Sequence, residues 1–143
     1  MNVDFLDTNI FVYLFDETDE RRREIARRLV HKGIESGDAC ISFQVVQETL
    51  AVLTGKLKKR ATPAEARHFL AGVLAPLWWL MPSPALHARA LELRERYALG
   101  FYDALLVAAA IDGGCTRLWS EDMQDGLRVD RLTIRNPFVK HSV

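Results

Sequence analysis

The clearest indication of the fold comes from residues 3 to 10, which read Val3-Asp4-Phe5-Leu6-Asp7-Thr8-Asn9-Ile10. Its first four residues are mainly apolar and predict a short strand. The polar residues that follow stop this strand and can begin a helix, because Asp, Thr and Asn side chains cap free backbone N–H groups. The stretch therefore predicts a strand that passes directly into a helix.

The same alternation continues along the rest of the chain. Apolar runs predict strands at residues 39–42, 78–81, 116–119 and 132–134. Helical spacing of apolar residues predicts helices at 20–35, at 43–57 with Ser42 as a cap, from the cap-and-proline pairs Thr62-Pro63 and Ser83-Pro84, and at 104–111. Short strands separated by helices favour a layered α/β domain, with a mainly parallel sheet flanked by helices on both faces.

Length and composition are those of a single domain covering residues 1–143. The chain is 49% hydrophobic, which suffices for one packed core without disulfides or structural metals. Its formal net charge is zero, so the field of the whole molecule does not mark it as a polyanion binder. Any contact with nucleic acid must use a local patch of positive charge.

Several features point to a cytoplasmic protein. Cys40 and Cys115 lie far apart in apolar stretches, which suits buried thiols in a reducing compartment. The first residues show no basic leader followed by an apolar run, so we expect no secretory signal. The most apolar window, residues 73–81, is much shorter than the ~20 residues of a membrane span, so we expect no membrane association.

Four acidic residues stand at the ends of elements or on apolar helices. Asp7 and Asp122 each follow a predicted strand, and ligands of parallel α/β sheets bind at the carboxyl ends of strands. Asp103 lies in the first turn of the most apolar helix, and Glu48 is a single carboxylate on a mostly apolar helix. A hard divalent cation needs such a cluster of oxygen ligands, and magnesium fits it better than zinc, which recruits His or Cys.

Each of these acids also has an ordinary structural explanation. Asp7 alone would be a helix cap, Asp103 a partner of the helix dipole, and Glu48 a solvated helix residue. The segment that contains Glu121, Asp122 and Asp125 would be a polar surface turn. Only their joint placement favours a metal site.

Four motifs resemble those of the PIN-domain family, in the branch of the VapC-type toxins of toxin–antitoxin modules. They are Leu6-Asp7-Thr8-Asn9-Ile10, Ser42-Phe43-Gln44-Val45-Val46-Gln47-Glu48, Phe101-Tyr102-Asp103-Ala104-Leu105 with the later Ala108-Ala109-Ala110, and Ser120-Glu121-Asp122-Met123-Gln124-Asp125-Gly126. They occur in the order and at the spacing of the family, and they extend over nearly the whole chain.

The resemblance implies a three-layer α/β/α fold and a ribonuclease that depends on Mg²⁺ or Mn²⁺ and leaves a 5′-phosphate. It makes Asp7, Glu48, Asp103 and Asp122 the catalytic, metal-binding acids, although Glu121 could exchange roles with Asp122. Candidates for supporting these acids or positioning water are Thr8, Asn9, Ser120 and Asp125. The resemblance further implies a homodimer or higher oligomer and a small antitoxin as partner.

The expected reaction is the cleavage of RNA by metal-activated water attacking the scissile phosphate. Positive charges near the site must receive the RNA, although a run of charge can also be no more than a solvated helix face. The candidate RNA-binding residues are Arg22, Arg27, Lys56, Lys58, Lys59 and Arg60.

Two other functions compete with a nuclease. A phosphotransferase of the haloacid-dehalogenase kind also has an Asp after its first strand, but it needs a second Asp two residues later, where this chain has Asn9. A non-catalytic module could use the same fold to bind RNA or a protein. Such a module could lose the four acids freely, and all four are present.

Overall fold

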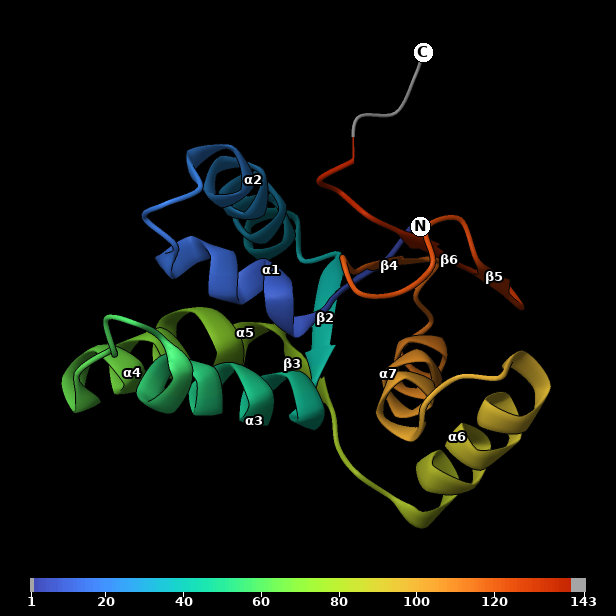
Figure 1. Ribbon diagram of the computed structural model, residues 1–143. Coiled ribbons are helices and arrows are strands. Elements are labelled where there is room, and N and C mark those ends of the chain that lie inside the picture. The colour runs from blue at the N-terminus through green and yellow to red at the C-terminus, as the bar shows by residue number, and fades with distance from the viewer. Residues whose placement is uncertain (1, 140–143) are drawn as a thin grey trace.

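The computed structural model describes residues 2–139 and contains a six-stranded sheet (Figure 1). The strand order is β3-β2-β1-β4-β6-β5, and neighbouring strands are parallel apart from β5, which is antiparallel to β6. The strands are β1 (Asp4–Leu6), β2 (Ala39–Ser42), β3 (Trp78–Leu80), β4 (Arg117–Trp119), β5 (Arg128–Val129) and β6 (Leu132–Arg135). The mainly parallel sheet that the sequence predicts is confirmed.

Helices connect the parallel strands. The α-helices are α1 (Thr8–Val12), α2 (Glu20–Ser36), α3 (Phe43–Ala51), α4 (Pro63–Phe69), α5 (Ala75–Leu77), α6 (Pro84–Tyr97) and α7 (Phe101–Asp112). A 3-10 turn, η1 (Tyr13–Phe15), follows α1, and π-helical segments, η2 (Val52–Lys56) and η3 (Leu70–Leu74), extend α3 and α4. No helix within residues 2–139 is both long and apolar enough to cross a bilayer.

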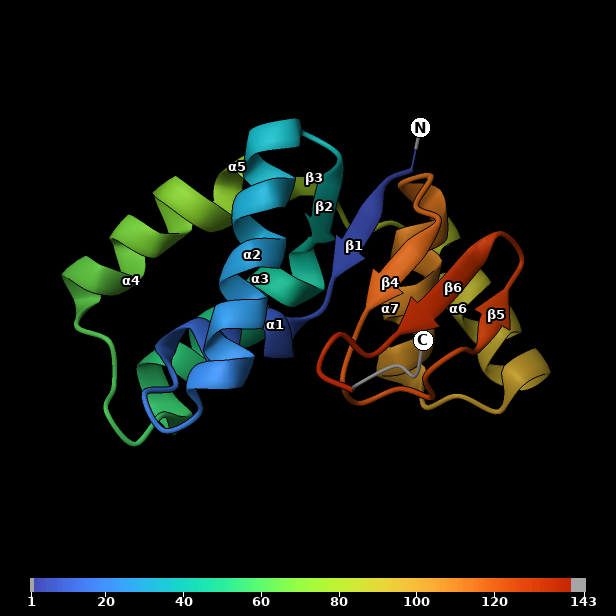
Figure 2. The same ribbon diagram turned by 90° about the horizontal axis from the view of Figure 1, so that it is seen from above.

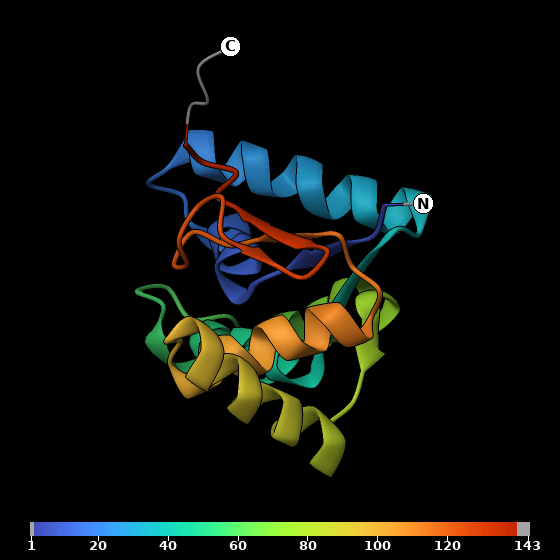
Figure 3. The ribbon, with the colours of Figure 1, turned by 90° about the vertical axis from the view of Figure 1, so that its right-hand side faces the viewer.

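The elements form three layers. Helix α2 lies on one face of the sheet, and α6 and α7 lie on the other (Figure 3). Seen from above, the faces of β4, β6 and β5 that point towards the viewer carry no helix in the described part of the chain (Figure 2). Helices therefore lie on both faces of the sheet, as predicted. The face on the side of α2 is only partly covered by helices.

The core lies between the sheet and α7. Every residue of α7 from Ala104 to Ala110 is buried, and the strands contribute Phe5, Ile41 and Leu118, which are fully buried. Each large apolar side chain buried in this way contributes about 1.5–3 kcal/mol relative to an exposed one. The helix predicted at 104–111 is thus present and is almost wholly buried.

One close approach depends on a glycine near the end of α2. A Cβ atom at position 33 would lie 2.5 Å from the Cβ of Ala39, which is shorter than real side-chain contacts allow. Gly33 therefore lets α2 pass directly over the start of β2. The helix ends at Gly37, whose φ of 71° is the left-handed conformation that glycine adopts without strain.

The predicted cysteine environment is also found. Cys40 and Cys115 are free and buried, and their Sγ atoms lie 3.3 Å apart. The hydrogen bond with Cys40 and burial both raise the pKa of the Cys115 thiol. A raised thiol pKa suits an unreactive, structural role for this pair.

The three helix caps predicted from the sequence are the N-cap residues of α3, α4 and α6, and Ser42 differs from the other two in its side-chain contact. Thr62 forms a reciprocal capping box with Glu65, and Ser83 accepts a hydrogen bond from the N–H of Leu86. Ser42 is the N-cap residue of α3, as predicted, but its side chain makes no capping hydrogen bond within the described residues. The helix predicted at 43–57 is α-helical only to Ala51.

Candidate active site

The first acidic position lies where two neighbouring strands end. Strands β1 and β4 are parallel, and Leu6 is aligned with Trp119 at their carboxyl ends. The N–H of Asp7 donates to the carbonyl oxygen of Trp119 at 3.0 Å, so the segments that follow the two strands remain together. Residues 7 and 120–122 therefore meet at one edge of the sheet, as the rule for parallel sheets predicts.

Asp7 is the most buried of the four acids. Its Oδ1 accepts a hydrogen bond from the N–H of Thr8 at 2.7 Å, and its Oδ2 accepts one from the hydroxyl of Ser120 at 2.7 Å. The pKa of Asp7 is raised to about 6. Burial is the largest cause, the two hydrogen bonds act in the opposite direction, and the charges of Asp122 and Glu48 add to the increase. Asp7 thus caps α1, as the structural explanation predicts, and also belongs to a group of interacting carboxylates.

Glu48 is held by two side chains. The hydroxyl of Thr8 donates to its Oε2 at 3.0 Å, and the amide of Gln44 donates to its Oε1 at 3.2 Å. The same amide donates to the carbonyl oxygen of Tyr102 at 3.0 Å, which connects α3 to the first turn of α7. Our sequence analysis did not select Gln44, although its position four residues before Glu48 places the two on one helix face.

Asp103 and Asp122 are more exposed. The amide of Asn9 donates to Oδ2 of Asp122 at 3.1 Å, and the N–H of Asp122 donates to the hydroxyl oxygen of Ser120 at 3.3 Å. Burial raises the pKa of Asp103, and the charges of Asp122 and Glu48 raise it further. Because Asp122 and Glu48 act on both Asp7 and Asp103, the four predicted acids share one region of negative charge.

Positive side chains do not neutralise this region within residues 2–139. None of the ion pairs there includes any of the four carboxylates. Two amide oxygens beside the acids, Oδ1 of Asn9 and Oε1 of Gln44, are buried without a hydrogen-bond partner among the described residues. Carboxylate and amide oxygens are the ligands that Mg²⁺ and similar cations prefer, so this donor set fits such an ion.

The same part of the chain does not form a closed metal cage. Within residues 2–139, no group of three or more His, Cys, Asp or Glu side chains is close enough to hold a metal ion as it stands. The arrangement is thus an open cluster of carboxylates. Mg²⁺ often binds to such clusters, because it keeps several of its waters and needs few protein ligands.

Comparison with known families agrees with this geometry. Residues 5–130 match the family model described as the PIN domain. The chain belongs to the PIN domain family. The match extends from the first strand to β5 and includes all four acids.

Solved structures show the same PIN fold. A toxin–antitoxin complex from Klebsiella pneumoniae is 21% identical, with a TM-score of 0.67 over 94% of this chain and 97% of that chain. VapBC2 from Rickettsia felis, bound to a promoter DNA fragment, is 20% identical, with a TM-score of 0.66 over 94% and 98%. VapC20 of Mycobacterium tuberculosis, a toxin that cleaves the sarcin-ricin loop, is 22% identical, with a TM-score of 0.59 over 83% and 91%. No curated protein matches the sequence.

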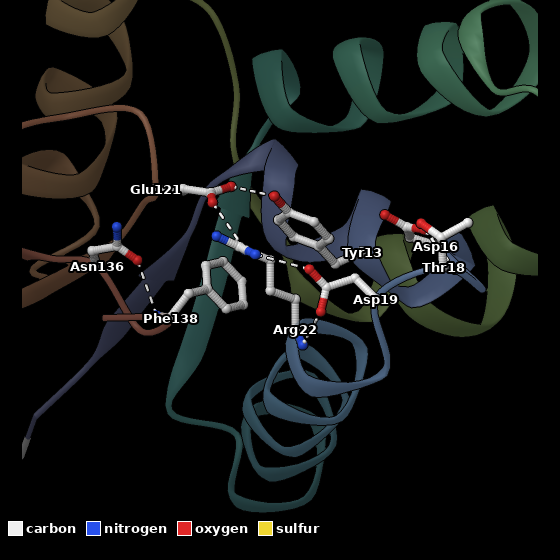
Figure 4. A network of polar contacts seen from close by, with 8 residues as sticks. All are labelled: Tyr13, Asp16, Thr18, Asp19, Arg22, Glu121, Asn136 and Phe138. Atoms are coloured by element: carbon white, nitrogen blue, oxygen red, sulfur yellow. Dashed lines mark hydrogen bonds and ion pairs between the residues drawn. The ribbon is translucent and has the colours of Figure 1, made fainter. Parts of the chain in front are cut away.

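Glu121 of this PIN domain is bound by side chains of η1 and α2. Its carboxylate accepts hydrogen bonds from the hydroxyl of Tyr13 and from Nε of Arg22, as Figure 4 shows. Burial, followed by the hydrogen bond to Glu121, raises the pKa of Tyr13 to about 12. The geometry therefore assigns Asp122, and not its neighbour, to the acidic cluster.

The candidates for supporting the acids divide into two groups. Thr8 contacts two of the four carboxylates, Asp7 and Glu48, and Asn9 and Ser120 contact one each. Asp125 instead accepts a hydrogen bond from the N–H of Asn136 and forms an ion pair with Arg135 at 3.6 Å. These contacts connect the segment that contains Asp125 to the last residue of β6 and to the residue that follows it.

The candidate RNA-binding residues occupy two places. The exposed residues of one group, Lys56, Lys58, Lys59 and Arg60, line a cavity of about 540 Å³, which Asp16, Glu17 and Glu65 also line. On α2, Arg27 lies 4.0 Å from Glu24, and Arg22 is paired with Asp19 and Glu121. Arg22 thus has protein partners on both sides, whereas the other group remains open to solvent.

Proposed function

We propose that this PIN domain is an endoribonuclease that depends on Mg²⁺ or Mn²⁺. The observation that carries the proposal is the convergence of Asp7, Glu48, Asp103 and Asp122, from four separate segments, on one region where residues 2–139 supply no compensating ion pair. Collecting four carboxylates is costly unless a cation binds among them. The family membership supports the same activity.

The four carboxylates would hold one or two divalent cations. Such a cation supplies Lewis acidity to the scissile phosphate and lowers the pKa of water. The surrounding side chains orient the carboxylates: Ser120 holds Asp7, Thr8 and Gln44 hold Glu48, and Asn9 holds Asp122. Because these contacts orient three of the four acids before a ligand arrives, the site is partly preorganised.

The test is cleavage of RNA by the purified protein. We expect cleavage with Mg²⁺ or Mn²⁺, none after addition of EDTA, and none from Asp7→Asn, which changes the side chain little and should keep the native circular dichroism spectrum. Asp130→Asn is a matched control, since Asp130 is exposed and its positive φ of 54° is tolerated by Asn. If EDTA or the Asp7→Asn substitution leaves cleavage undiminished, the proposed metal-dependent activity is contradicted.

We further propose that the protein is the toxin of a toxin–antitoxin pair and forms a homodimer or higher oligomer. The support is the fold shared with structures of toxin–antitoxin complexes. Expression of the chain alone should arrest growth, and co-expression of a short reading frame beside its gene should relieve the arrest. Light scattering should give a mass above that of one chain; harmless expression and a monomer would contradict this part.

The second candidate function is a non-catalytic PIN module that binds RNA or a protein. It predicts binding of RNA without cleavage in any divalent cation. The presence of all four acids favours the nuclease, because binding alone does not need them.

A further inference from the structure

The side chain of Glu121 is fixed through both carboxylate oxygens. The hydroxyl of Tyr13 donates to Oε2 at 2.5 Å, and Nε of Arg22 donates to Oε1 at 3.1 Å. Tyr13 and Arg22 lie 108 and 99 residues earlier in the chain, so these contacts are tertiary. The turn after β4 is therefore fastened to η1 and to the start of α2 (Figure 4).

Arg22 is itself held in place. Its Nη1 donates to Oδ2 of Asp19 at 2.8 Å, and Asp19 caps α2 by accepting from the N–H of Arg22 at 3.0 Å. The guanidinium carbon lies 5.6 Å from the ring centre of Tyr13 and 5.7 Å from that of Phe138, and the two rings meet edge to face. Cation–π contacts of this kind add to the ion pairs. Glu121 is thus attached to a rigid support.

Asp122 follows Glu121 directly and lies on an exposed part of the turn. Its own polar contacts are the amide of Asn9 at 3.1 Å and the hydroxyl of Ser120 at 3.3 Å. Among these, only the contact with Asn9 involves the carboxylate, whereas the contact with Ser120 involves the backbone N–H, so the direction of the Asp122 carboxylate depends on the backbone of the turn. The contacts of Glu121, one residue away, restrict that backbone.

We propose that Tyr13, Arg22 and Glu121 form a clamp that positions Asp122 for the cation and keeps the neighbouring carboxylate of Glu121 out of the site. This inference rests on the proposed metal-dependent function. The three residues are positioning residues, because they act through Asp122 and touch neither substrate nor cation.

A purely electrostatic role for Arg22 makes the opposite prediction. A positive charge near a cation site weakens cation binding, so removing it should tighten the binding. Removing a positioning contact should instead weaken the binding, because Asp122 loses its orientation. The direction of the change in affinity therefore separates the two roles.

The experiment measures Mn²⁺ binding by isothermal titration calorimetry, without RNA. Tyr13→Phe removes one hydrogen bond, changes no charge and keeps the ring against Phe138; Arg22→Met removes the ion pairs. Arg28→Met is the matched control, since within the described residues Arg28 pairs along its own helix alone, with Glu24 at 3.4 Å. We expect Kd for Mn²⁺ to rise roughly tenfold in Tyr13→Phe and Arg22→Met and to stay unchanged in Arg28→Met.

Two outcomes would overturn the clamp: an unchanged Kd in both Tyr13→Phe and Arg22→Met, or tighter binding in Arg22→Met. Weaker binding in either variant, with Arg28→Met unchanged, supports it. If the wild-type protein itself binds no Mn²⁺, the proposed function fails first, so the two failures are distinguishable. Circular dichroism of each variant verifies that the measured protein is folded.

Discussion

At the scale of single residues, burial gives Asp7 an unusual response to pH. Its pKa rises from 3.8 to about 6 in the folded protein. Between about pH 4 and pH 6, Asp7 therefore binds a proton more often in the folded state than in the unfolded chain. The contribution of this residue to the free energy of unfolding should fall as pH rises through this window, by roughly 3 kcal/mol at ~1.4 kcal/mol per pKa unit.

The measurement is urea unfolding in EDTA at pH 4 and pH 7, for the wild type and Asp7→Asn. The variant cannot titrate at this position, so the wild type should gain stability relative to it as the pH is lowered. A stability difference that is the same at both pH values would show that Asp7 has an ordinary pKa.

Asp103 links the acidic cluster to stability in another way. Burial and the charges of Asp122 and Glu48 raise its pKa, so its ionised form is disfavoured when no cation is present. We expect Asp103→Asn to melt at a higher temperature than the wild type in EDTA. Mn²⁺ should raise the melting temperature of the wild type and move that of the variant much less, because a ligand of the native state stabilises it by mass action.

Thermal melts of both proteins, with EDTA and with Mn²⁺, are sufficient to decide this point. A less stable variant in EDTA, together with equal shifts in Mn²⁺, would make Asp103 a structural residue of α7.

The sequence identified the residues of the candidate site more readily than the contacts that orient them. Asp7 and Asp122 were predictable because each follows an apolar strand, and parallel strands end at one edge. The roles of Tyr13 and Glu121 were not, since a tyrosine and a glutamate 108 residues apart carry no local sign of their contact. Gln44 was within reach, because its spacing from Glu48 is helical.

At the scale of elements, the crossing of α2 over β2 depends on Gly33. In Gly33→Ala the new Cβ would lie 2.5 Å from the Cβ of Ala39, so backbone must shift. We expect a loss of stability of about 1–3 kcal/mol, despite the better helix propensity of Ala. Urea unfolding measures it.

Gly72 provides the matched control for this substitution. It lies in the helical segment η3, and a Cβ there would meet nothing within 4 Å. Gly72→Ala should leave stability unchanged or increase it. Equal effects of the two substitutions would mean that the close approach at Gly33 does not limit the packing.

Elements with a strong local signal were predictable and the others were not. Helix α7 has an uninterrupted apolar run, and α4 has the Thr62–Glu65 capping box, so both were expected. Strand β5 has only two residues, and its pairing depends on β6 rather than on its own pattern. The change from α to π geometry at Val52 leaves no mark in the hydrophobic spacing, so the sequence predicts one continuous helix there.

At the scale of the whole molecule, a net charge of zero makes the distribution of charge important. The exposed basic residues around the 540 Å³ cavity are the larger of the two candidate groups for contact with RNA. Reversal of two of them, in Lys58→Glu with Lys59→Glu, should weaken RNA binding. It should also reduce the slope of log K against log salt by about 1.4, if each lysine contacts one phosphate of a single strand.

Fluorescence anisotropy with labelled RNA, in the Asp7→Asn background and over a range of salt, measures both quantities. Arg94→Glu with Arg96→Glu makes the same change of charge on exposed positions of α6 and should alter the slope less. Identical slopes for the wild type and the lysine variant would make this group a solvated surface only.

The strand order also determines when the protein can first act during its synthesis. Strand β1 lies between β2 and β4, and Asp7 is held by Ser120, 113 residues later in the chain. A ribosome delivers the amino-terminal half first, and that half leaves one edge of β1 without its partner. The four acids cannot come together before residue 122 has emerged. A nascent chain therefore contains no assembled cluster of the four acids until the segment that carries Asp122 has been synthesised.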